Sequence, residues 1–84
     1  MTKTKPIRWS TEKNLELMQT RGISFEEILS RIDQGGLLMT LEHPNQGKHP
    51  NQKILVVKLR EYAHLVPFVE SEEHIFLKTI MPSR

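Results

Sequence analysis

The segment from residue 23 to residue 36 restricts the fold of this chain more than any other. Ser24 and Glu27 form a capping box, a pair whose side chains satisfy free backbone N–H groups at the start of a helix. Apolar residues then recur with the spacing of a helix that has one buried face, namely Phe25, Ile28, Leu29 and Ile32. Gly35 and Gly36 end the pattern. We therefore expect an amphipathic helix whose apolar face packs against a second layer.

A weaker helical pattern precedes this segment. Ser10 or Thr11 offers an N-cap, and Leu15 and Met18 share one face of the helix that would follow. Gly22 suits the left-handed conformation that commonly follows a helix end. The predicted N-terminal layer is therefore two short helices within residues 11–34, joined as a helical hairpin or corner.

Strand-like segments dominate the second half of the chain. The expected meander over residues 37–81 has strands at 37–42, 54–60, 63–69 and 75–81, a polar loop at 43–52 and a turn at Arg60–Tyr62. Pro67 interrupts the third strand, which favours an edge position or a bulge. Helices followed by an antiparallel meander are an α+β pattern. The predicted fold is one domain, residues 1–84, with two N-terminal helices packed on a four-stranded, mainly antiparallel sheet.

The composition excludes several classes of site. Cysteine is absent, which excludes a disulfide scaffold, a thiolate zinc site and a cysteine nucleophile. His43 and His49 in the polar loop match no zinc spacing, so we expect no metal and no cofactor. No apolar run approaches the ~18 residues of a membrane-spanning helix, and no apolar stretch follows the basic N-terminal residues. We expect a cytoplasmic protein without membrane association.

The excess positive charge lies in the second half of the chain. Residues 1–42 carry six Lys or Arg and six acidic residues, whereas residues 43–84 carry six and four, together with all four histidines. Because side chains alternate across a strand, one sheet face is expected to hold the basic residues Lys58, Arg60, His64 and Lys78. The same face is expected to hold the apolar residues Val56, Val66, Phe68, Phe76 and Ile80. This grouping assumes a register that a bulge at Pro67 would change.

Such a face has two interpretations. A cationic surface with aromatic side chains suits single-stranded nucleic acid, on which bases stack and phosphates pair with cations. Alternatively, the apolar members contact a partner chain, and the lysine stems merely cover them. The residues alone leave both interpretations open.

Three pieces of this sequence, in this order, resemble the BrnT-type toxins of bacterial type II toxin–antitoxin systems. They are WSTEKN at Trp9–Asn14, RGISFEE at Arg21–Glu27 and the closing IMPSR at Ile80–Arg84. The resemblance covers residues 7–84 and implies a RelE-like fold, metal-independent ribonuclease activity and inhibition by a cognate antitoxin protein. Two features depart from the family pattern. The loop at 43–52 is rich in Pro and Asn instead of acidic residues, and relatives usually continue past the position of Arg84 into a basic helix.

Metal-free RNA cleavage needs a base for the 2′-OH, an acid for the departing 5′-oxygen and cations around the phosphate. The predicted catalytic residues are His64, which suits acid–base work, and Lys58 and Lys78. The predicted phosphate-binding residues are Arg60, Arg84, Lys13 and Arg21. Each has an ordinary alternative role: a strand histidine with a backbone partner, a solvated lysine, or an arginine paired with Glu61 or Glu70.

The sequence thus predicts a ribonuclease toxin that acts on RNA and associates with its antitoxin in a hetero-oligomer, or with itself as a homodimer. Two other functions stay open. One is a non-catalytic protein-binding module that uses the same sheet face. The other is a small DNA-binding regulator, although neither expected helix is rich in Arg and Lys.

Overall fold

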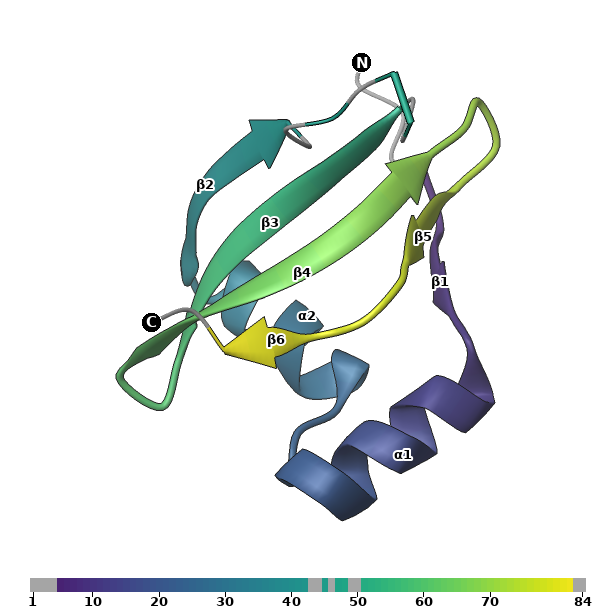
Figure 1. The fold of residues 1–84 in the computed structure, drawn as a ribbon. Coiled ribbons are helices and arrows are strands. Elements are labelled where there is room, and N and C mark those ends of the chain that lie inside the picture. The colour runs from purple at the N-terminus through teal and green to yellow at the C-terminus, as the bar shows by residue number, and fades with distance from the viewer. Residues whose placement is uncertain (1–4, 43–44, 46, 49–50, 83–84) are drawn as a thin grey trace.

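The computed structural model of the protein describes residues 5–42, 45, 47–48 and 51–82 and shows two helices against one mixed sheet (Figure 1). The elements are β1 (Ile7–Trp9), α1 (Thr11–Arg21), α2 (Phe25–Asp33), β2 (Leu37–Glu42), β3 (Gln52–Leu59), β4 (Tyr62–Glu70), β5 (Ile75–Leu77) and β6 (Met81–Pro82). The predicted α+β class and the two N-terminal helices are confirmed.

The sheet contains six strands within the described residues, not the predicted four. The strand order is β1-β5-β4-β3-β2, and β6 pairs with β4. β1 and β5 are parallel, and the other neighbours are antiparallel. The helices carry the chain from β1 at one edge of the sheet to β2 at the other, and α2 passes behind the strands (Figure 1). The predicted last strand is split into β5 and β6, because the chain leaves the ladder between them and buries Ile80 in the core.

Both helices begin at the predicted N-caps and end before the predicted glycines, although the Glu27 carboxylate of the predicted capping box binds Arg60. The Ser10 hydroxyl accepts a hydrogen bond from the Lys13 N–H at the start of α1, and Ser24 accepts from the Glu27 N–H at the start of α2. Gly22 ends α1 in the left-handed conformation, with φ of 66°. The chain turns sharply between the helices as a result, so that α1 and α2 share one side of the sheet.

The core lies between the helices and the sheet. Its buried apolar residues are Leu17, Ile23, Phe25 and Ile28 from the helical layer, and Val57, Leu59, Val66, Phe68, Leu77 and Ile80 from the strands and their connections. Trp9 stacks on Phe25, with 5.5 Å between the ring centroids. This contact fixes β1 against the start of α2.

Asn14 joins the two helices at their corner. Its Oδ1 accepts a hydrogen bond of 2.8 Å from the Phe25 N–H, and its Nδ2 donates one of 2.8 Å to Glu26 Oε1. The bond from Asn14 is the main cause that lowers the pKa of the Glu26 carboxyl below its ordinary value. Asn14, Phe25 and Glu26 all belong to the segments that carry the family resemblance. In this structure they build the helical corner.

A two-residue turn joins β3 to β4. Arg60 and Glu61 have φ of 54° and 71°, and positive φ at both central residues is what a type I′ hairpin turn requires. Leu59 therefore pairs with Tyr62, and Val57 with His64. The predicted three-residue turn at Arg60–Tyr62 is wrong, because the turn has two residues and Tyr62 is the first residue of β4.

Candidate functional site

The face of the sheet that points away from the helices is called the outer face here. Cross-strand partners share a face, so the pairing register assigns its members. They are Arg8 on β1, Met39 and Leu41 on β2, Gln52, Ile54, Val56 and Lys58 on β3, Ala63, Leu65, Pro67 and Val69 on β4, Phe76 on β5 and Met81 on β6. The outer face is thus mainly apolar, although its members on β2 and β6 are exposed.

His64 does not lie on the outer face. It pairs with Val57, a buried core residue, so its side chain is on the side of the helices, where it is 9% exposed. Val66 and Phe68 follow it into the core. The prediction that these residues share a face with Lys58 is wrong, because the shorter turn shifts β4 by one residue and so inverts every side chain.

Lys58 and Lys78 do share a side of the sheet. Lys58 is opposite Ala63 in the β3–β4 pairing. The Lys78 N–H donates a 2.8 Å hydrogen bond to the Pro67 carbonyl, which extends the β4–β5 register and aligns Lys78 with the outer face. Both lysines are exposed. The sheet therefore separates them from His64, and the three predicted catalytic residues do not form one site.

Arg60 holds the tip of the β3–β4 hairpin against the helical corner. Its Nη2 donates to Glu27 Oε1 and to the Gly22 carbonyl, each at 3.0 Å, and its Nε donates to Glu27 Oε2 at 3.2 Å. The guanidinium is therefore hydrogen-bonded to groups of the protein itself, with a paired contact to the Glu27 carboxylate. The predicted phosphate contact is not the role that this structure gives Arg60, and the predicted partners Glu61 and Glu70 are replaced by Glu27.

The other predicted phosphate-binding residues are dispersed. Lys13 Nζ lies 3.6 Å from Glu16 Oε2 in an ion pair along α1. Arg84 lies outside the described residues, as do His43 and His49. Arg21 is exposed at the last turn of α1.

One cleft brings two of the predicted residues together. Arg21, Ile23, His64, Ile80 and Pro82 line a hollow of about 210 Å³ between the end of α1 and the strands β4 and β6. His64 Nδ1 lies 3.1 Å from the Tyr62 carbonyl oxygen, which can only accept a hydrogen bond. The hydrogen therefore sits on Nδ1, and Nε2 is unprotonated in the neutral ring. The sequence indicated Arg21 and His64 separately, but not this meeting point.

A second hollow, of about 360 Å³, was not predicted. It lies at the opposite end of β4 and is lined by Lys5, Asn51, Lys53, Glu70, Ser71 and Glu72. Lys5 Nζ donates to Glu70 Oε2 at 2.8 Å and to the Ser71 carbonyl at 2.7 Å. The hydrogen bond from Lys5 lowers the pKa of the Glu70 carboxyl below its ordinary value. These contacts tie the start of the described chain to the end of β4.

Over the described parts of the chain, no three or more His, Cys, Asp or Glu side chains are grouped to hold a metal ion. The same residues contain no helix of the length and hydrophobicity that crossing a membrane requires. Comparison with known proteins identifies no matching family model, curated protein or solved structure. The functional proposal therefore depends on the sequence resemblance and on the geometry of the cleft.

Proposed function

We propose that this chain is a RelE-like, metal-independent ribonuclease toxin of a type II toxin–antitoxin pair, with the Arg21–His64 cleft as its RNA site. The observation that carries the proposal is the meeting of a base and a cation in one hollow. RNA cleavage without a metal requires this combination. The order of the three sequence segments that resemble BrnT-type toxins supports the same function.

In the proposed reaction, His64 Nε2 accepts the proton of the ribose 2′-OH. The 2′-oxygen then attacks the adjacent phosphorus, and the bond to the 5′-oxygen breaks, which leaves a 2′,3′-cyclic phosphate. The 5′-oxygen takes a proton from water. Arg21 provides positive charge for the phosphate, and the buried Ile23 and Ile80 lower the local polarity, which strengthens that attraction.

The test is cleavage of single-stranded RNA in excess EDTA, read out as cyclic-phosphate ends. We expect His64→Gln to lower the rate about 100-fold or more, because it removes the general base. Arg21→Ala should lower kcat/KM on the order of tenfold. Lys58→Ala is the matched control, since this residue lies across the sheet from His64 and should retain the parent rate. Far-UV circular dichroism checks that each variant is folded.

The outcomes separate the proposed functions. If Lys58→Ala loses activity and His64→Gln keeps it, the chemistry belongs to the outer face and the cleft assignment is wrong. Absence of cleavage by the parent protein, together with absence of growth arrest on expression, would refute the ribonuclease. That result would favour a non-catalytic protein-binding module, which the apolar outer face supports.

A further inference from the structure

The two edges of the sheet differ in how well they are protected against pairing with another chain. β1 has three residues, follows Pro6 and carries Arg8 at its centre. Short length, proline and charge are the usual features that keep an edge strand from pairing. β2 has six residues, and its only charged residue is Glu42 at the end. A register shift between Leu37 and Met39 is its one irregularity.

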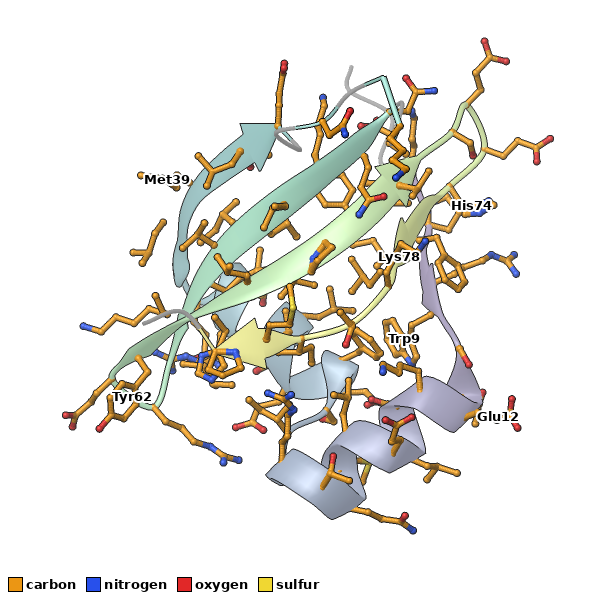
Figure 2. All side chains as sticks on the ribbon, in the orientation of Figure 1. Trp9, Glu12, Met39, Tyr62, His74 and Lys78 are labelled. Atoms are coloured by element: carbon orange, nitrogen blue, oxygen red, sulfur yellow. The ribbon has the colours of Figure 1, made fainter. Side chains whose placement is uncertain are left out.

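β2 also exposes apolar side chains along its length. Leu38 and Met39 are each 53% exposed, and Leu41 is 43% exposed. Met39 projects clear of the sheet at its free edge (Figure 2). Among the described residues, β3 is the only strand that pairs with β2. The other edge of β2 therefore presents backbone N–H and C=O groups at every second residue, beside apolar side chains.

We infer that β2 pairs with β2 of a second copy of this chain, antiparallel and about a two-fold axis at Thr40. Such pairing joins two sheets into one and uses the same strand of each copy. It does not rest on the proposed ribonuclease activity, because the Arg21–His64 cleft lies on α1, β4 and β6.

Symmetry restricts the register of the pairing, and the exposed side chains choose between the possible axes. A two-fold axis perpendicular to the sheet keeps both outer faces on one side, and it places one residue opposite its own copy. With the axis at Thr40, Met39 of each copy is opposite Leu41 of the other. Both residues belong to the outer face, so two exposed apolar pairs become contacts. An axis at Met39 instead would place Leu41 opposite Leu37. Because Leu37 pairs with the core residue Val57, it belongs to the helix side of the sheet and not to the outer face.

The charges are compatible with a second copy as the occupant. With the axis at Thr40, the two Glu42 residues lie four positions apart along the strands, about 13 Å at about 3.3 Å per residue. That separation exceeds the Debye length of about 8 Å at physiological ionic strength, so their repulsion is screened. Each Glu42 is also the cross-strand partner of Lys53 on β3, so a positively charged residue of the same chain lies on the neighbouring strand. The centre of the interface carries no charge.

Molar mass across a concentration series tests the pairing. We expect the parent protein to shift from monomer to dimer between about 1 μM and about 1 mM, as measured by sedimentation equilibrium. The double variant Met39→Lys, Leu41→Lys places like charges opposite each other and should weaken the dimer on the order of tenfold or more. The double variant Met39→Lys, Leu41→Glu places opposite charges in register and should restore dimerisation.

The control is Leu15→Lys, since Leu15 is an apolar residue of α1 with a similar exposed fraction and lies away from β2. It should dimerise like the parent. A parent protein that stays monomeric throughout the series overturns the inference. A dimer that survives the two lysines excludes β2 as the interface, and failure of the Lys–Glu pair to restore it excludes this register.

Crosslinking provides a second readout that does not depend on charged variants folding. The chain has no cysteine, and residues opposite each other in an antiparallel pair lie about 4.5–5.5 Å apart at Cα, within disulfide range. Thr40→Cys should therefore form a covalent dimer on mild oxidation much faster than Thr20→Cys, an exposed position on α1. Equal rates for the two variants would overturn the two-fold axis at Thr40.

Discussion

The side chain of Asn14 offers the sharpest test of how this fold is held together. Asn14 is buried, and its Oδ1 accepts the Phe25 N–H at the first residue of α2. Replacement by alanine removes that acceptor, while the N–H stays buried among the core residues that surround Phe25. A buried donor without a partner costs about 1–3 kcal/mol. We therefore expect Asn14→Ala to lower the free energy of unfolding by about 2 kcal/mol.

That loss is large for a chain of 84 residues. Domains of this size unfold with a total free energy on the order of 4–13 kcal/mol, and 1 kcal/mol shifts Tm by roughly 4–8 °C. Urea unfolding followed by circular dichroism measures the change, with Gln19→Ala on the exposed face of α1 as the control. A loss within about 0.5 kcal/mol for Asn14→Ala, the range of ordinary surface substitutions, would refute the reasoning.

Asn14→Asp separates the two hydrogen bonds. Aspartate keeps an oxygen for the Phe25 N–H but replaces the amide donor with a second carboxylate oxygen facing Glu26. We expect this variant to be destabilised at neutral pH and to recover part of the loss as the carboxylates are protonated. An equal loss of stability relative to the parent at pH 4 and pH 7 would show that Glu26 takes no part.

Three further predictions concern the turns and the ion pairs. Glu61→Gly should raise the free energy of unfolding by about 0.5–1 kcal/mol in urea, because glycine adopts positive φ without strain; a decrease would contradict the turn geometry. Gly36→Ala should lower it by about 1–3 kcal/mol, since the added Cβ would lie 2.8 Å from a backbone oxygen of α2, whereas Gly47→Ala should be neutral. The pKa of Glu70 is depressed by Lys5, so its contribution is present above the ordinary carboxyl pKa and is lost as the pH falls through the lower folded value. Thermal unfolding across that acidic range should therefore depend less on pH in Glu70→Gln than in the parent.

Local sequence was sufficient for the helices because their signals are local. The two N-caps, Gly22 at the end of α1 and the apolar spacing of α2 each act within a few residues. The six-stranded sheet was only partly predicted. β1 is three residues long and gains its place in the sheet from β5, a partner almost seventy positions away in the chain.

The β3–β4 turn shows why the predicted grouping of His64 with Lys58 on one sheet face was wrong. Type I′ turns normally use Asn or Gly, and Arg60–Glu61 contains neither. The bonds from Arg60 to Glu27 and to the Gly22 carbonyl fasten this turn to the helical corner. Those contacts join residues 33 and 38 positions apart, so the local sequence around the turn could not predict them.

The sequence by itself determined the α+β class, the two capped helices and the identities of Arg21 and His64 as candidate functional residues. Only the tertiary structure decided that Arg21 and His64 line the same cleft. Side chains in a strand alternate with a period of two, so one residue more or less in a turn exchanges the two faces of the next strand. That single residue moved His64 from the side of Lys58 to the side of Arg21.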